Sequence, residues 1–375
     1  MIIGVLKEKS PEQRVAVLPE SISPITDLKT EVMIERGAGE NAHASDEQYS
    51  EGGAKLADRA GLLSSADVLL SVNPLTVEEI RSVGKEQVLI GTYGPLNNPD
   101  IVKACTSAGL TLFSMDAIPR ITRAQSMDVL SSMATVAGYR AVLDAAFNLP
   151  VFFPMFMTAA GTIKPAKVLV LGAGVAGLQA IATARKLGAV VEAFDVRSAV
   201  KEEVQSLGAK FVEVEGARED KDAGGYAVEQ TEEFKEKQSQ MIQDHAEKSD
   251  VIICTAQIPG KKAPVLIKKE TVEKMKNGSV IVDLAASSGG NCELSENDKT
   301  VVKAGVTIIG NSNYPSGMPM DSSRMYGKNL INFLKLLIDE DGNLKLDFED
   351  DVVKGACITH KGEIMNERVK SVIGS

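Results

Sequence analysis

The sequence is poor in the residues that build metal centres and disulfide frameworks. It contains three histidines and four cysteines, and no two cysteines form a CxxC pair. Zinc sites and disulfide-stabilised domains need such residues in clusters, so we predict neither. Scattered cysteines are typical of a reducing compartment. The four are Cys105, Cys254, Cys292 and Cys357.

Positive charge is also scarce. The chain has 41 lysines and arginines against 51 aspartates and glutamates, which gives a formal net charge of −10. Its pI is about 5.1. A chain of this kind has no broad positive field to attract a phosphate backbone, so we predict that nucleic acid is not a partner.

Long hydrophobic runs are missing as well. The charge-free stretch from Ala145 to Ile163 contains PVFFPMFM, but Pro150, Pro154 and several polar residues interrupt it. A membrane span needs about 20 consecutive apolar residues, so we predict none. The N-terminal MIIGVLKEKS lacks the apolar segment and cleavage site of a secretory signal, and we expect a first β-strand there.

What is present is the composition of a folded α/β protein. Hydrophobic residues make up 44% and charged residues 25% of the 375 positions, a length that favours two domains. Short apolar runs alternate with amphipathic stretches in the first third, and a helical pattern extends from Gln125 to about Phe147. The runs that predict strands are IIGVL, EVMIE, DVLLSV, QVLIGT and TLFSM.

A second alternating series follows and predicts another doubly wound parallel sheet. After Gly310 we expect a loop, NSNYPSGMPMDSSRMYG, and then an apolar helix, KNLINFLKLLID, that returns to the first domain. The predicted fold is α/β with two Rossmann-like domains separated by a cleft. The first domain is discontinuous (1–130 plus 318–375) and the second is 131–317. The strand patterns of the second series are KVLVLG, VVEAFD, KFVEV, VIICTA, SVIVDLA and VTIIG.

A GxGxxG motif lies directly after the strand pattern KVLVLG and directly before a helical pattern. In this context Gly172 allows a tight turn, Gly174 lets a pyrophosphate approach the backbone, and Gly177 lets the helix contact the strand. The helix N-terminus, with Val175 and Ala176, stabilises phosphate charge. The alternative is a glycine turn that binds no nucleotide.

The next strand pattern ends in an acidic residue, Asp195, 18 positions after Gly177 (195 − 177 = 18). A carboxylate at this place accepts hydrogen bonds from ribose hydroxyls, which favours NAD over NADP. Val196 and Arg197 follow, and an arginine here can pair with a 2′-phosphate or lie along the edge of the cofactor. The sequence leaves that choice open.

The segment PRITRAQSMDVLSSMATVAGYRAV, followed by KVLVLGAGVAGLQAIATARKLGAVVEAFDVR, resembles the NAD(H)-binding domain of proton-translocating nicotinamide nucleotide transhydrogenase. The resemblance extends from KEKSPEQRVAVLPE near the start to MYGKNLINFL near the end. The pattern RxTRAQxMDxLSS is far more specific than GxGxxG. The family also shares its fold with alanine dehydrogenase.

The resemblance implies that Arg120, Gln125 and Asp128 hold the dihydronicotinamide. Gln125 and Asp128 are three positions apart, so at a helix start they would share one face, to which Ser131 adds a hydroxyl. Arg120 would reach the same ligand from the preceding loop. The alternative is a solvated helix start with ordinary capping.

Further cofactor contacts are implied by the resemblance. Gly225 and Tyr226, in DAGGYA, match a mobile loop that closes over nucleotide, with Tyr226 as the lid residue. Gln238, in FKEKQSQ, and Gln257, in TAQIPGK, match other cofactor contacts. Gln257 stands where an apolar residue is more usual, and the alternative for the charged segment around Tyr226 is an ordinary exposed helix.

The activity implied is direct hydride transfer from NADH to NADP+ held on a partner domain. The partners would be that NADP(H)-binding domain and a membrane-spanning subunit that moves protons. The resemblance further implies a homodimer without its own membrane span, located on the cytoplasmic face of the membrane through its partners. No residue is predicted as an acid or base, because hydride transfer needs no proton abstraction.

Two other functions stay open. A self-contained alanine dehydrogenase needs a proton donor and cationic groups for the substrate carboxylate. Arg14 and Asp283 match two of the relative's four residues, but Asn73 stands at the lysine position and Tyr93–Leu96 contains no histidine. We therefore disfavour this function. The second alternative is a non-catalytic NAD-sensing module.

Overall fold

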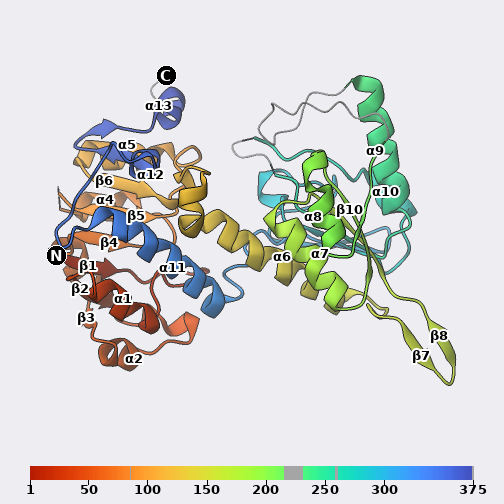
Figure 1. Ribbon diagram of the computed structural model, residues 1–375, viewed down its shortest axis with the longest axis horizontal. Coiled ribbons are helices and arrows are strands. Elements are labelled where there is room, and N and C mark those ends of the chain that lie inside the picture. Colours follow the sequence, from red (N-terminus) through yellow and green to blue (C-terminus); the bar gives the residue numbers. More distant parts are fainter. Residues whose placement is uncertain (85, 215–230, 258–260, 374–375) are drawn as a thin grey trace. The chain divides into compact units, whose positions relative to one another are not determined.

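Alternating strands and helices fold into two units. The computed structural model describes residues 1–375 except 85, 215–230, 258–260 and 374–375. Unit 1 comprises Met1–Met133 and Pro315–Ser375, and unit 2 comprises Ala134–Tyr314. Each unit contains a mainly parallel sheet flanked by helices (Figure 1). The fold class predicted from the sequence, α/β with two Rossmann-like domains, is confirmed.

Among the described residues, eight strands form the sheet of unit 1 in the order β17-β16-β6-β5-β4-β1-β2-β3. The strands from β3 to β6 pair in parallel, whereas β16 and β17 are antiparallel additions from the C-terminal segment. The strands are β1 (Ile2–Val5), β2 (Glu31–Glu35), β3 (Lys55–Ala57), β4 (Val68–Leu70), β5 (Val88–Gly91), β6 (Thr111–Ser114), β16 (Cys357–His360) and β17 (Glu363–Ile364).

Side chains of this sheet alternate between two cores. Val68 and Leu70 belong to one cluster and Leu69 to another, because successive residues of a strand point to opposite faces. Both faces are therefore covered, as parallel sheets require. The covering helices are α1 (Ile22–Thr26), α2 (Asp46–Glu51), α3 (Arg59–Ser65), α4 (Val77–Ser82), α5 (Pro99–Ala108), α11 (Pro319–Leu337), α12 (Asp351–Ala356) and α13 (Glu367–Ile373).

The sheet of unit 2 has, among the described residues, seven strands in the order β11-β10-β9-β12-β13-β15-β14. All neighbours are parallel except β14 and β15. The strand order reverses at β9, so β9 and β12 form the switch point where ligands bind in such sheets. The strands are β9 (Lys167–Leu171), β10 (Val190–Phe194), β11 (Lys210–Phe211), β12 (Val251–Cys254), β13 (Val280–Asp283), β14 (Thr300–Lys303) and β15 (Val306–Ile309).

Two cores also cover this second sheet, one with Val168 and Val170 and one with Leu169 and Leu171. The flanking helices are α7 (Val175–Lys186), α8 (Lys201–Ser206), α9 (Glu232–Ala246) and α10 (Lys269–Lys274). Short 3₁₀ helices are η1 (Pro19–Ser21), η2 (Glu40–Ala42), η3 (Met115–Ala117), η4 (Thr122–Met127), η5 (Ser198–Val200) and η6 (Ala286–Ser288).

Two predicted helix starts are wrong. The long helix α6 (Val129–Asn148) begins after Asp128, and Gln125 lies in the preceding 3₁₀ helix η4, because Asp128 has extended backbone (ψ 92°). The second helix, α11, begins at Pro319, inside the segment predicted as a loop. Proline suits a first helical position because its φ is already helical and its missing N–H has no intrahelical partner.

The charge-free stretch after α6 forms a hairpin of β7 (Phe156–Thr158) and β8 (Gly161–Ile163). It projects beyond the other elements of unit 2 (Figure 1), and all six of its residues are exposed. Its base is fixed, since Phe153 is buried and its carbonyl accepts a hydrogen bond from Ala166 N at 3.0 Å. Among the described residues, no helix combines the length and apolarity that crossing a bilayer requires.

Candidate functional site

The glycine-rich turn connects β9 to α7 at the switch point of the second sheet. Gly172 has a φ of +99°, which favours glycine, and a Cβ there would lie 2.6 Å from Thr255 Oγ1. A Cβ on Gly177 would lie 1.9 Å from the carbonyl oxygen of Gly172, whereas a Cβ on Gly174 would meet nothing within 4 Å. The turn is thus closed on the protein side and open at Gly174, the geometry that backbone recognition of a pyrophosphate requires.

Thr255, which the sequence analysis missed, holds this turn from the next strand of the sheet. Its hydroxyl donates hydrogen bonds to the carbonyls of Gly172 at 3.0 Å and Leu171 at 3.2 Å. Thr255 directly follows β12, the parallel neighbour of β9. No spacing rule could have found it, because only the sheet order brings residues 172 and 255 together.

Asp195 follows β10, the other neighbour of β9, and its carboxylate is already engaged. It accepts hydrogen bonds from Ala173 N at 2.7 Å and Arg197 N at 2.9 Å, and from Arg197 Nε and Nη2 at 3.0 Å each. Burial alone raises the pKa of Asp195, but these hydrogen bonds outweigh it and lower the pKa below its ordinary value. Asp195 is therefore an anion whose charge Arg197 balances.

The other predicted cofactor contacts of unit 2 lie around this region. Val175 and Ala176 form the first turn of α7, and Val196 is exposed between Asp195 and Arg197. Gln238 is half-buried on α9, and Gln257 follows β12, where its Nε2 donates to Leu284 O at 2.9 Å. The predicted lid residues Gly225 and Tyr226 lie outside the described residues.

In unit 1 the segment RITRAQSM is held by buried side chains and long-range hydrogen bonds. Ala124 and Met127 are buried in the core of unit 1. The carbonyl of Ser126 accepts hydrogen bonds from Asn329 Nδ2 at 2.8 Å and Asn332 Nδ2 at 3.1 Å, both on α11. The anchored segment leaves Arg120 and Gln125 exposed, where a ligand can contact them.

Arg123 adds an ion pair to this anchoring. Its guanidinium donates to both carboxylate oxygens of Asp350, at 2.6 and 2.9 Å. Asp350 also caps α12 by accepting from Val352 N at 2.8 Å and Val353 N at 3.3 Å. The sequence analysis missed Asp350, Asn329 and Asn332, because they lie about 200 positions from the segment that they hold.

Asp128 and Ser131, both predicted site residues, contact each other. Asp128 Oδ1 accepts from Ser131 N at 2.9 Å and Oδ2 from Ser131 Oγ at 2.6 Å. Asp128 therefore caps α6, an arrangement that ties up a backbone donor of the helix start. The predicted shared face of Gln125 and Asp128 is wrong, because η4 and α6 are separate helical segments.

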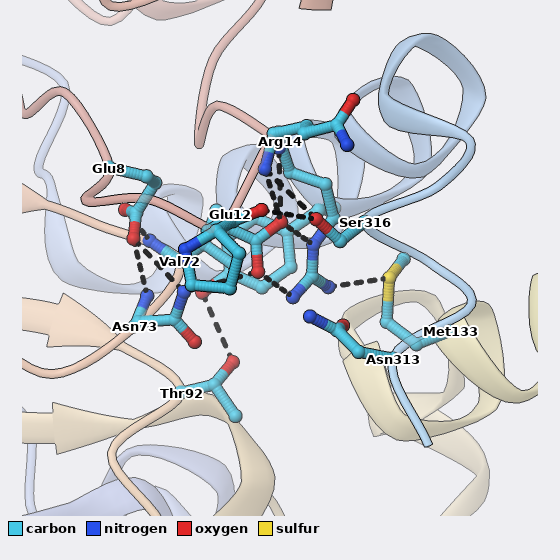
Figure 2. A network of polar contacts seen from close by, with 12 residues as sticks. Glu8, Glu12, Arg14, Val72, Asn73, Thr92, Met133, Asn313 and Ser316 are labelled. Atoms are coloured by element: carbon cyan, nitrogen blue, oxygen red, sulfur yellow. Dashed lines mark hydrogen bonds and ion pairs between the residues drawn. The ribbon is translucent and has the colours of Figure 1, made fainter. Parts of the chain in front are cut away.

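The residues relevant to an amino-acid dehydrogenase form a polar network at the carboxyl ends of β1 and β4 (Figure 2). Arg14 donates to Glu12 from Nε at 2.8 Å and from Nη2 at 2.7 Å, so a carboxylate of the chain itself balances its charge. Asn73 Nδ2 donates to Glu8 and to Glu12, at 3.1 Å each. Position 73 thus supplies a neutral amide that is already engaged.

Asp283, the fourth residue considered for that activity, is buried in unit 2. Its Oδ2 accepts from Asn291 N at 2.8 Å, Cys292 N at 2.9 Å and Ser295 Oγ at 2.6 Å, and its Oδ1 from Ala285 N at 3.0 Å. These hydrogen bonds hold the turn after β13. Asp283 therefore has a structural role that explains its presence without a substrate.

A parallel sheet with a glycine-rich strand-to-helix turn at its switch point, and an acidic residue after the neighbouring strand, defines a Rossmann-type α/β protein. Comparison with known proteins narrows this class. The chain belongs to the alanine dehydrogenase/PNT family: the model of the N-terminal domain matches residues 4–137 and that of the C-terminal domain matches residues 141–367.

Among its relatives is a fragment of the NAD(P) transhydrogenase alpha subunit of Rhodospirillum rubrum, 49% identical over 98% of this chain and 98% of that protein. The solved structure of a transhydrogenase from Sinorhizobium meliloti is 44% identical, with a TM-score of 0.89 over 97% of this chain and 100% of that chain. An L-alanine dehydrogenase structure, 23% identical with a TM-score of 0.81 over 100% of this chain and 99% of that one, shares the fold. The resemblance found in the sequence is confirmed.

Proposed function

We propose that this chain is the NAD(H)-binding subunit of a proton-translocating transhydrogenase. The observation that carries the proposal is the turn of unit 2, where Gly174 is open while Gly172 and Gly177 are closed against protein atoms. The N-terminus of α7 stabilises pyrophosphate charge at this turn. Asp195 supplies the carboxylate for the ribose hydroxyls. The similarity to transhydrogenase alpha subunits supports this assignment.

In this proposal the residues around η4 hold the nicotinamide. Bound NADH supplies a hydride, which passes directly to NADP+ on a separate NADP(H)-binding domain. Arg120 and Gln125 are exposed polar groups on an anchored segment, so they orient a ring without large rearrangement. Asp128 and Ser131 complete the set through the fixed start of α6.

The partners follow from the same assignment. The name of the relative from Rhodospirillum rubrum describes it as the first portion of an alpha subunit, which supports a complex built from several polypeptides. We propose that a membrane-spanning subunit couples hydride transfer to proton translocation and carries this chain on the cytoplasmic face of the membrane. A homodimer is the expected state of the chain itself.

The first experiment titrates the purified chain with NADH and NADPH and follows nicotinamide fluorescence. Hydride transfer is then assayed with and without an NADP(H)-binding transhydrogenase domain. We expect selective NADH binding, activity only with the partner and none with pyruvate and ammonia. Activity with pyruvate and ammonia alone would establish an amino-acid dehydrogenase, and NADH binding without any activity in the complex would leave an NAD-sensing module.

A substitution separates the catalytic from the sensing function. Gln125→Asn shortens the side chain by one methylene and keeps the amide, so it withdraws the amide from the ring without adding charge. We expect slower hydride transfer in the reconstituted complex. An unchanged rate together with unchanged NADH affinity would remove Gln125 from the site. Sedimentation without detergent tests the partition, since a chain that requires detergent contradicts the separate membrane subunit.

A further inference from the structure

Gly138 brings the backbone of α6 into contact with the backbone of α7. Gly138 is buried, and a Cβ built on it would lie 2.1 Å from the carbonyl oxygen of Ala176, with Ala176 C at 2.9 Å and Cα at 3.0 Å. The obstructing atoms are main-chain atoms, which a rotamer change cannot move. A side chain at position 138 therefore requires one of the two helices to shift.

Ala176 belongs to the glycine-rich turn, between Gly174 and Gly177. Gly177 provides a similar contact on another side, since its Cβ would lie 1.9 Å from Gly172 O. The first turn of α7 is thus confined by the backbone of the β9–α7 turn and by α6. Confinement matters here because this turn presents the backbone N–H groups that bind phosphate.

The surroundings of Gly138 make the contact rigid. Ala141 and Ala145 on α6 and Ala180 and Ala184 on α7 are fully buried in the same core. Small side chains allow two helices to approach closely, and a close-packed interior has little room to absorb a displacement. An added methyl group at position 138 is therefore transmitted to the turn.

We infer that Gly138 is a positioning residue for the cofactor, acting as a fourth glycine of the dinucleotide site. It lies 34 positions before Gly172 (172 − 138 = 34), outside the GxGxxG motif. The inference rests on the proposed function, because it takes the turn as the phosphate-binding element. Its role is to set the position of the first turn of α7, and it touches no ligand itself.

The size of the displacement gives the expected effect. Cβ atoms essentially never approach another atom closer than 3.0 Å, so Gly138→Ala moves Ala176 or α6 by at least 0.9 Å (3.0 − 2.1). Hydrogen bonds from N–H groups to phosphate oxygens span only about 2.7–3.2 Å. We expect the dissociation constants of both NADH and ADP to rise at least tenfold.

Gly310 offers a matched control. It is buried, and a Cβ there would lie 2.1 Å from the carbonyl oxygen of Glu296 and 3.0 Å from its carbon, a collision of the same kind. Gly310 follows β15, three strands away from β9 in the sheet. Gly310→Ala therefore disturbs the backbone of unit 2 comparably without touching α7.

The experiment compares wild type, Gly138→Ala and Gly310→Ala by thermal unfolding and by titration with NADH and with ADP. We expect weak binding of both nucleotides by Gly138→Ala alone, with similar losses of thermal stability in the two variants. Wild-type affinity in Gly138→Ala, or equally weakened binding in both variants, overturns the positioning role. A wild-type chain that binds neither nucleotide overturns the proposed function, and this inference with it.

A second measurement uses the wild-type chain, in case Gly138→Ala does not fold. Hydrogen exchange is followed with and without ADP, which carries no nicotinamide. We expect ADP to slow exchange at residues 175–178 of α7 and at the facing residues 136–140 of α6, but not around Glu296. Protection of α7 without protection of α6 overturns the inference.

Discussion

The guanidinium of Arg197 holds the carboxylate of Asp195 from both sides, with Nε donating to Oδ1 and Nη2 to Oδ2 at 3.0 Å each. Together with the amides of Ala173 and Arg197, four donors fill the roughly four acceptor positions of a carboxylate. Ribose hydroxyls can therefore bind Asp195 only if the guanidinium gives up at least one hydrogen bond. Arg197 competes with the ribose and is not free to attract a 2′-phosphate.

This relationship predicts the cofactor preference of Asp195→Asn. The substitution removes the charge that holds Arg197, so the guanidinium becomes available to a 2′-phosphate. We expect NADH affinity to fall about tenfold or more, as for a lost hydrogen bond to a charged group, and the preference over NADPH to narrow. Fluorescence titration with both nucleotides measures this. Arg197→Ala is the control and should retain the preference for NADH; an unchanged preference in Asp195→Asn would contradict the prediction.

The capping of α6 by Asp128 allows its structural and ligand roles to be separated. Asparagine is as good an N-cap as aspartate, whereas alanine costs about 1 kcal/mol. We expect Asp128→Asn to unfold near the wild-type temperature but to transfer hydride at least tenfold more slowly in the reconstituted complex. Asp128→Ala should lose both stability and rate. A wild-type rate in Asp128→Asn would leave Asp128 as a helix cap alone.

The buried Glu12–Arg14 pair predicts a stability that depends on pH. Burial alone raises the pKa of Glu12, but the hydrogen bonds and charge of Arg14 outweigh it and lower the pKa from 4.5 to about 2. A carboxyl with a lowered folded pKa stabilises the protein above pH 4.5, and this stabilisation is lost as the pH falls towards 2. We expect Glu12→Gln to reduce the free energy of unfolding at pH 7 by about 3 kcal/mol, with a smaller difference from wild type at about pH 3 in urea titrations.

Glu8 provides a control of opposite sign in the same network. Burial raises its pKa above 4.5 despite hydrogen bonds from Val72 N and Asn73. The folded state then binds the proton more tightly, so wild type gains stability relative to Glu8→Gln as the pH falls. Parallel pH profiles for Glu8→Gln and Glu12→Gln would show that neither carboxyl has the assigned environment.

The β7–β8 hairpin gives a prediction for the proposed homodimer. A two-stranded hairpin alone is marginally stable in water, yet Met157 is 79% exposed, and Phe156 is 42% exposed and contacts Phe152 with ring centroids 4.8 Å apart. Two copies of a chain with a net charge of −10 meet with least repulsion at an uncharged surface. We expect Met157→Asp to shift the chain to monomers in gel filtration with light scattering.

Val302→Asp is the matched control for the hairpin, because Val302 is 67% exposed on β14 of the same unit. It should leave the association unchanged. A wild-type chain that is monomeric would show the homodimer to be wrong. Dimers of equal stability in wild type and Met157→Asp would move the interface away from the hairpin.

Elements whose signal is contiguous in sequence were predicted well. The strands KVLVLG and VVEAFD are β9 and β10, and the end of the long helix near Asn148 is confirmed. The short or partly exposed strands β3, β14 and β17 were missed, because their apolar pattern is weak and pairing with neighbours defines them. The start of α6 was misplaced because the cap between Asp128 and Ser131 competes with helical continuation from Gln125.

The sequence by itself determined two α/β units and the glycine-rich turn of the second, because strand periodicity and GxGxxG are carried by neighbouring residues. The tertiary structure alone decided which groups are engaged. Arg14 is paired with Glu12, Ser126 is held by Asn329 and Asn332, and Gly138 lies against Ala176. The last two join residues at least 38 positions apart (176 − 138 = 38), and even the short Arg14–Glu12 pairing depends on how the loop folds, so local spacing carries no record of these contacts.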